Sequence, residues 1–166
     1  YLLFLFHHIF CYKNYSKNKL ITRGHLDKEL YYVNENISKI KWRIFNETKK
    51  IGSLNCQKAK AVFRGRVYTA WFTNSIPVSD GPWKLHGLPG LILEASDSTK
   101  EVSFFFKSIE SIPQQKYPKI NIPNKGRISL SEYRSIKKKY FETFLNQKQL
   151  EKKLKAKLPR GVEVKV

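Results

Sequence analysis

Alternating hydrophobic and polar positions dominate the first two thirds of the chain. Ile40, Trp42 and Ile44 alternate with Lys41 and Arg43, and the period of two that places one side-chain face inward marks a strand. Similar strand patterns recur at 30–33, 58–64, 66–72, 91–95 and 102–109. The pattern predicts a meander of antiparallel strands.

Short polar segments separate these runs. Turns are expected at Asn34–Asn36, at Lys49–Gly52 and at Asp97–Lys100. The dipeptide Arg64-Gly65 is typical of a tight hairpin turn, although Gly65 can also be a bulge within one long strand. Residues 74–90 and 113–126 hold too many prolines and glycines for a regular element, so both are expected to be irregular.

The period changes to that of a helix near the C-terminus. Ser129 and Glu132 fit a capping box, and a stripe of apolar residues follows at spacings of three and four: Tyr133, Ile136, Tyr140 and Phe144. The helix is expected over about 130–157, packed on the sheet through this stripe, and Val162–Val166 can add a last strand. The predicted fold class is mainly β: one strongly curved antiparallel sheet or incomplete barrel with one long C-terminal helix, in a single domain over residues 1–166.

Composition narrows the class of protein. Hydrophobic residues make up 41% of the 166 residues, which excludes a disordered chain. The stretch Tyr1–Tyr12 is almost wholly apolar but too short for a spanning helix, and His7 and His8 interrupt it. We therefore expect no membrane span, and the stretch is either a core strand or the remnant of a larger N-terminal segment.

The net charge is +19, and residues 113–166 alone carry +11. Such a charge is typical of proteins that bind nucleic acids or anionic membranes. It also arises when lysine is simply the default surface residue, which is the interpretation we favour. Because no RNP, zinc-finger or helix-turn-helix pattern is present, nucleic acid is not an expected partner.

Catalytic and metal-binding patterns are weak. His7 and His8 face opposite ways in a strand, His25 is isolated in the sequence, Asp80 precedes a Gly-Pro turn, and Glu94 lies within a strand. No nucleophile-elbow, zinc-protease or P-loop pattern occurs. We expect no cofactor, metal or catalytic residue. A hydrolase with scattered residues, or a metal site built from His86, Cys56 and a carboxylate, remains a minor alternative.

One segment identifies a relationship. Residues 74–95 contain the hexapeptide Gly87-Leu88-Pro89-Gly90-Leu91-Ile92, preceded by Ile76-Pro77 and Gly81-Pro82-Trp83-Lys84. Upstream stand Trp42, Cys56 and the run Phe63-Arg64-Gly65-Arg66, which leads into Tyr68, Ala70 and Trp71. In these features the chain resembles the GLPGLI family, over about 40–97 and plausibly over a core of about 10–112.

The resemblance implies an exported bacterial protein, periplasmic or secreted, and it implies no reaction because no activity is established for that family. In an oxidising compartment Cys11 and Cys56 can form a disulfide, and two free buried thiols are an equal alternative.

The glycines and the proline of the hexapeptide allow residues 76–90 to reverse sharply and to present Trp83, Leu85 and Leu88 to the sheet. The resulting bend is either a packed corner or one lip of an apolar pocket that Trp71 also lines. If the strand is continuous through Gly65, Arg64 and Arg66 lie on one face and can bind an anion. The other interpretation is that they pair with Glu94 or Glu47.

The sequence therefore predicts a non-enzymatic envelope protein that binds an apolar ligand or another envelope protein. The predicted binding residues are Trp71, Trp83, Leu85, Leu88, Arg64 and Arg66. The alternative function is binding of an anionic surface or nucleic acid through the basic helix, which carries Lys137–Lys139 and Lys152–Lys157.

Overall fold

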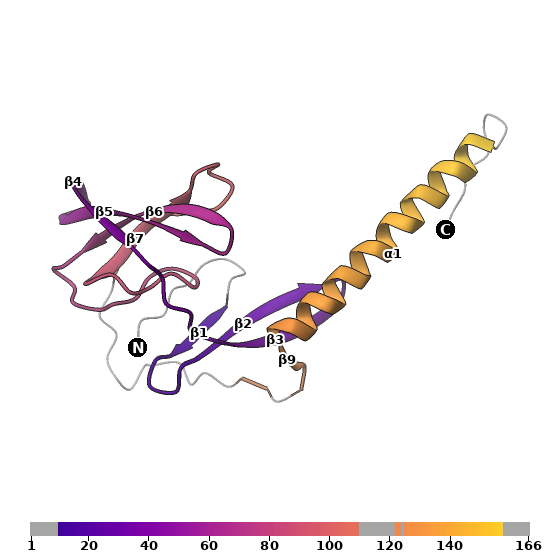
Figure 1. The fold of residues 1–166 in the computed structure, drawn as a ribbon, viewed down its shortest axis with the longest axis horizontal. Coiled ribbons are helices and arrows are strands. Elements are labelled where there is room, and N and C mark those ends of the chain that lie inside the picture. Colours follow the sequence, from indigo (N-terminus) through magenta and orange to yellow (C-terminus); the bar gives the residue numbers. More distant parts are fainter. Residues whose placement is uncertain (1–9, 110–121, 124, 158–166) are drawn as a thin grey trace. The chain divides into compact units, whose positions relative to one another are not determined.

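The computed structural model describes residues 10–109, 122–123 and 125–157, and these residues form two sheets and one helix (Figure 1). The larger sheet has the order β4-β5-β6-β7-β8, and its strands are Arg43–Ile51, Leu54–Phe63, Arg66–Thr73, Leu91–Asp97 and Ser103–Phe104. The smaller sheet has the order β1-β2-β3-β9, and its strands are Cys11–Asn14, Lys19–Leu26, Glu29–Asn36 and Arg127–Ser129. Helix α1 spans Leu130–Lys157. The predicted mainly β class is confirmed, with two sheets in place of one, and in the described residues neither sheet closes into a barrel.

The chain divides into two compact units. One comprises residues 1–20 and 36–121, and the other comprises residues 21–35 and 122–166. The expectation of a single domain over 1–166 stays a prediction.

The five-stranded sheet is the antiparallel meander that the alternating pattern predicts. In the β5–β6 hairpin Phe63 pairs with Arg66, and Arg64 and Gly65 form the turn with φ values of 52° and 78°. Two successive residues with positive φ match the turn twist that suits a two-residue hairpin. The alternative of one continuous strand with a bulge at Gly65 is wrong.

Two predicted strand boundaries are wrong. Strand β4 begins at Arg43 rather than near Ile40 and runs through Lys49 to Ile51. Trp42 stays outside the strand because its indole Nε1–H donates to the carbonyl oxygen of His86 at 2.8 Å. Side chains that pack against a loop can therefore produce the same alternating pattern as a strand. Of the three apolar residues Ile40, Trp42 and Ile44, only Ile44 lies in the strand, and it is exposed.

The other errors have long-range causes. Strand β3 continues through the expected turn at Asn34 because β9 pairs with it in parallel, with Asn34 opposite Ser129. The expected strand at 102–109 shrinks to Ser103–Phe104, after which Phe105 is exposed. Val162–Val166, His7 and His8, and most of the irregular connection 113–126 lie outside the described residues.

The first unit has two hydrophobic clusters. The larger cluster joins the loop between β6 and β7 to one set of strand side chains: Ala59, Phe63, Tyr68, Ala70, Phe72, Leu85, Leu88, Ile92, Ala95 and Phe104. The smaller cluster contains Ile51, Cys56, Leu91 and Leu93, with Trp71 and Phe106 packed against it. The larger cluster therefore holds the loop that the sequence singles out.

In the second unit, α1 starts with the predicted capping box. The Glu132 N–H donates to Ser129 Oγ at 3.1 Å, and the Ser129 N–H donates to Glu132 Oε2 at 2.7 Å. Hydrogen bonding of the Glu132 carboxyl to the Ser129 side chain, and to the Ser129 backbone N–H, holds the pKa of this carboxyl below its usual value. The cap satisfies donors that the helix itself leaves free.

The predicted packing of α1 on a sheet is only half right. Tyr133 and Ile136 are partly buried, and Tyr133 lies so close to Gly24 that a Cβ there would come within 2.6 Å of its ring. Tyr140 and Phe144 are exposed, because α1 continues well past the strands of its own unit (Figure 1). Among the described residues, no helix is long and apolar enough to span a bilayer.

Candidate functional site

Strand β1 fastens the loop of residues 76–90 through one row of its side chains. The Cys11 thiol donates to the carbonyl oxygen of Trp83 at 3.0 Å. Lys13 forms a largely buried ion pair with Asp80 and also donates to the carbonyl oxygens of Gly81 and Leu85 at 2.8 and 3.0 Å. All three ammonium donors can therefore be satisfied, as a buried charge requires.

Asp80 is the centre of this anchor. Its Oδ1 also accepts from the hydroxyl of Tyr15 at 2.9 Å and from the N–H of Gly81 at 2.7 Å. Burial and, secondarily, the Asp80 charge raise the pKa of Tyr15 well above its usual range, so the phenol stays a donor. The interpretation of Asp80 as a turn residue is thus incomplete, because Lys13 lies outside every strand predicted from the sequence.

His86 is a second buried polar group in this loop. Its ring lies 5.8 Å from that of Tyr15, and Nδ1 is 2.9 Å from the carbonyl oxygen of Lys84, to which it must donate. Burial lowers the pKa of His86 from its ordinary value of 6.5, so the folded protein holds this imidazole neutral.

This shift predicts a pH dependence of stability. The unfolded chain binds a proton on His86 more readily than the folded chain does. The stabilisation that depends on a neutral His86 is therefore fully present above about pH 6.5 and is lost as the pH falls below that value. We expect the unfolding free energy to decline between about pH 6.5 and 5 in urea titrations followed by tryptophan fluorescence. His86→Gln should flatten that decline while His25→Gln leaves it intact, and identical profiles for the two variants would contradict the assignment.

A hollow of about 280 Å³ opens at the end of the larger cluster. Its lining residues are Arg64, Arg66, Tyr68, Trp83, Val102 and Phe104. The Trp83 indole meets Phe63 edge-on at 6.0 Å and stands 6.5 Å from the ring of Tyr68, so aromatic neighbours fix its position. The hollow therefore offers an apolar wall beside two guanidinium groups.

The structure brings only part of the predicted site together. Trp83, Arg64 and Arg66 line the hollow. Leu85 and Leu88 are fully buried in the larger cluster, and Trp71 packs on the smaller one. Leu85 and Leu88 are thus core residues that hold the loop, and Trp71 and Trp83 belong to different clusters.

The expected pairing of Arg66 with Glu94 or Glu47 is wrong. Arg66 pairs with Asp97 and, at 2.6 Å, with Glu101, whereas Glu94 pairs with Lys49 and Glu47 with Lys58. The backbone N–H of Val102 and the Arg66 guanidinium hold the pKa of Asp97 below its usual value. A contact between β6 and the β7–β8 turn therefore orients Arg66 at the hollow, a pairing that sequence spacing does not reveal.

No disulfide joins Cys11 and Cys56 in the structure. Cys11 bonds to the loop, and Cys56 lies in the smaller cluster, where burial raises the pKa of its thiol. Within residues 10–109, 122–123 and 125–157, no three His, Cys, Asp or Glu side chains gather as a metal site would require.

Fold and site together define a mainly β protein with a small aromatic hollow beside an anchored loop. Residues 62–94 match the model of a family described as a protein of unknown function (Porph_ging), and this segment contains the hairpin turn, Trp83 and the Gly87–Ile92 hexapeptide. None of the curated proteins matches the chain.

Two solved structures are similar to the chain. "Structure of PNGF-II in C2 space group" is 21% identical with a TM-score of 0.50, and the match covers 76% of this chain and 24% of that one. "Structure of PNGF-II in P21 space group" is also 21% identical, with a TM-score of 0.48 and coverage of 74% and 23%. The chain thus spans about a quarter of the length of these proteins. At this identity the first likeness shows the fold alone.

Proposed function

We propose that the chain is a non-enzymatic binding protein of the bacterial cell envelope, periplasmic or secreted, and a member of the GLPGLI family. Its site is the hollow beside Trp83, which takes an apolar group of a small ligand or of an envelope protein. The observation that carries the proposal is the lining itself, which combines aromatic and aliphatic walls with two arginines. Apolar walls with a few placed polar groups are typical of binding sites.

The anchored loop supports this function. Trp83 lies on the loop with a positive φ of 52°, and its chain neighbours Pro82 and Lys84 are both buried. The Trp83 carbonyl also accepts a hydrogen bond from Cys11. A wall held in this way needs little ordering when a ligand binds, which limits the entropic cost of association. The two interpretations of the loop, a packed corner and one wall of a pocket, are therefore compatible. Leu85 and Leu88 form the packed corner, and Trp83 forms the wall of the pocket.

The test uses the fluorescent probe 8-anilinonaphthalene-1-sulfonate, which joins apolar rings to an anionic group. Trp83→Ala removes one wall of the hollow and is expected to weaken binding about tenfold, equivalent to about 1.4 kcal/mol. Phe105→Ala is the matched control, because Phe105 is an exposed aromatic residue that does not line the hollow. Far-UV circular dichroism must stay native in both variants. Equal binding by the Trp83 variant would place the site elsewhere.

A stripe of exposed apolar residues on α1 supports the alternative function, binding of an anionic surface through the basic helix. Phe141, Phe144 and Leu145 are exposed, and Lys137 and Lys148 lie over the two phenylalanine rings at 5.8 and 5.5 Å. Apolar side chains beside lysines are typical of helices that bind anionic membrane surfaces. Binding to phosphatidylglycerol vesicles tests this alternative, and vesicle binding that is lost in a variant with Lys138→Gln and Lys139→Gln would support it.

A further inference from the structure

A bulge in edge strand β4 gathers positive charge on one face of the five-stranded sheet. The register between β4 and β5 shifts between Ile44 and Thr48, and the side-chain amide of Gln57 donates to the carbonyl oxygen of Phe45 at 2.9 Å within this irregular stretch. Bulges redirect side chains. Here the bulge turns Arg43 and Phe45 toward the side chains of Lys58 and Lys60 on β5.

Three cations converge on the ring of Phe45. The guanidinium carbon of Arg43 is 5.2 Å from the ring centroid, and the ammonium nitrogens of Lys60 and Lys58 are 5.8 and 6.0 Å away. Each such contact contributes about 0.5–1 kcal/mol at exposed sites. The ring therefore holds together charges that repel one another.

Arg43 and Lys60 lie directly opposite each other in the ladder. Like charges in this position destabilise a sheet. Lys58 has Glu47 as its partner at 2.6 Å, but within the described part of the chain no carboxylate forms an ion pair with Arg43 or Lys60. An anion placed between Arg43 and Lys60 would relieve the repulsion that the cation–π contacts only partly offset.

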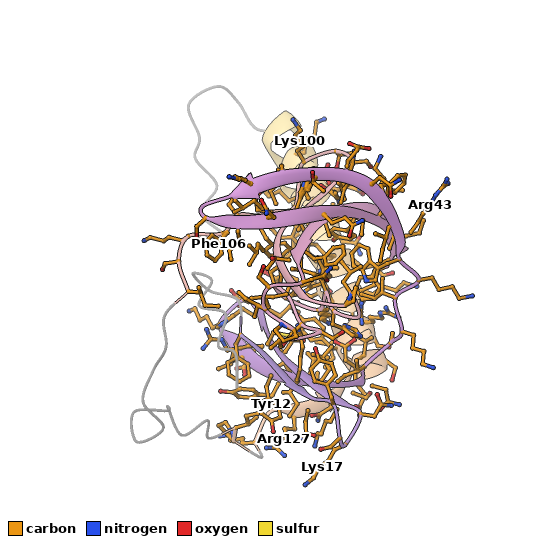
Figure 2. All side chains as sticks on the ribbon, turned by 90° about the vertical axis from the view of Figure 1, so that its left-hand side faces the viewer. Tyr12, Lys17, Arg43, Lys100, Phe106 and Arg127 are labelled. Carbon is orange, nitrogen blue, oxygen red and sulfur yellow. The ribbon has the colours of Figure 1, made fainter. Side chains whose placement is uncertain are left out.

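The same face continues toward Trp71. Lys49 lies over its indole at 4.7 Å and Lys58 at 5.9 Å, and Lys49 also pairs with Glu94 at 2.5 Å. At the hairpin end of the face, Val62 is 72% exposed and pairs with the exposed Val67. Arg43 lies at the outer margin of the sheet (Figure 2). Cations, two half-buried rings and exposed apolar side chains thus share one open face.

We propose that this face, defined by Arg43, Phe45, Lys58, Lys60 and Trp71, binds single-stranded nucleic acid. Sheet faces that bind single strands combine basic side chains along the backbone with aromatic rings for the bases. Lys58 and Lys60 project from the same face about 7 Å apart along β5. Arg43 and Lys60 hold a phosphate between them, and Phe45 supports the adjacent base. Recognition of this kind needs none of the sequence motifs that are missing from the chain.

A flat membrane surface fits this face less well. The rings of Phe45 and Trp71 are half-buried beneath the cationic groups rather than projecting beyond them. Insertion into a bilayer requires protruding apolar side chains, and on this face Val62 and Val67 protrude at the hairpin end whereas the two rings among the cations do not. An anionic chain that lies along the strands meets the cations first and then reaches the rings.

The experiment measures fluorescence anisotropy of a labelled 20-mer of thymidine with the full chain over a series of salt concentrations. Binding to single strands weakens with salt by a logarithmic slope of about 0.7 for each phosphate neutralised. Arg43→Gln with Lys60→Gln removes two of these contacts, so the slope should become shallower by about 1.4 and low-salt affinity should fall about tenfold. Phe45→Ala should also weaken binding about tenfold but leave the slope unchanged.

The matched control removes two cations from α1, by Lys138→Gln with Lys139→Gln, and is expected to bind like the parent. Equal losses in the sheet and helix variants would overturn the proposal, since binding would then follow total charge. Absence of salt-dependent binding to the 20-mer would overturn it as well. Preference for phosphatidylglycerol vesicles over the 20-mer, lost in the helix variant, would overturn it in favour of the α1 alternative.

Discussion

Replacing Asp80 with asparagine is expected to lower the unfolding free energy by about 3–5 kcal/mol, because it leaves the ammonium group of Lys13 buried without a counter-charge. The side chains of Lys13 and Asp80 are only 7% and 13% exposed, so water cannot replace the lost partner. Asparagine keeps the size of the side chain, which isolates the effect of charge. Urea unfolding monitored by tryptophan fluorescence measures it, because Trp42, Trp71 and Trp83 all lie in the first unit.

Two further variants separate the ion pair from the chemical change. Asp27→Asn makes the same substitution at an exposed position and should change stability by less than about 0.5 kcal/mol. Lys13→Met combined with Asp80→Asn removes both charges and should recover part of the loss, since no lone charge stays buried. A loss below about 1 kcal/mol in the single variant would mean that the pair is solvated.

The local features of the fold could be predicted from the sequence. The Arg64-Gly65 turn and the Ser129–Glu132 cap each depend on a few adjacent residues, and both are confirmed. The inward orientation of Leu85 and Leu88 also follows from local chemistry, because a loop with large apolar side chains must bury them. These features need no knowledge of distant partners.

The site depends on partners that are remote in sequence. Lys13 and Asp80 are 67 residues apart, and Arg66 and Asp97 are 31 apart. A polar residue in a short strand, such as Lys13, carries no sign of burial, so the anchor of the loop could not be found from periodicity. The hollow likewise arises from side chains of three separate segments, and only Trp83, Arg64 and Arg66 have a local signal.

The basic face of the five-stranded sheet could not be predicted for the same reason, because it depends on residues that are remote in sequence. Lys58 and Lys60 alternate with Ala59 and Ala61, which predicts a strand with one solvated face. Their convergence with Arg43 on Phe45 depends on a register shift in β4 that the sequence does not mark. From the sequence alone, the net charge of +19 therefore indicates only a generally basic surface. The strand register is needed to identify the cations that lie opposite each other.

Gly87 and Gly90 are required in the hexapeptide for different structural reasons. Substitution at the two positions is therefore expected to lower the unfolding free energy by different amounts. Gly87 has a φ of +93° and open space around its Cβ position, where the nearest atoms belong to Trp42 at 3.9 Å. At Gly90 a Cβ would stand 2.1 Å from the carbonyl oxygen of Thr73. Gly90→Ala is therefore expected to cost about 3 kcal/mol or more, since backbone atoms of two neighbouring segments must separate.

The control for Gly90→Ala is Gly65→Ala in the hairpin turn, where φ is +78° and no atom lies within 4 Å of the Cβ position. That substitution carries only the backbone cost of about 1–2 kcal/mol. Urea unfolding of both variants should therefore place Gly90→Ala clearly below Gly65→Ala in stability, with a matching loss of probe binding because Trp83 lies on the displaced loop. Equal stabilities would show that Thr73 and Gly90 can separate freely, and the hexapeptide would then act through backbone conformation alone.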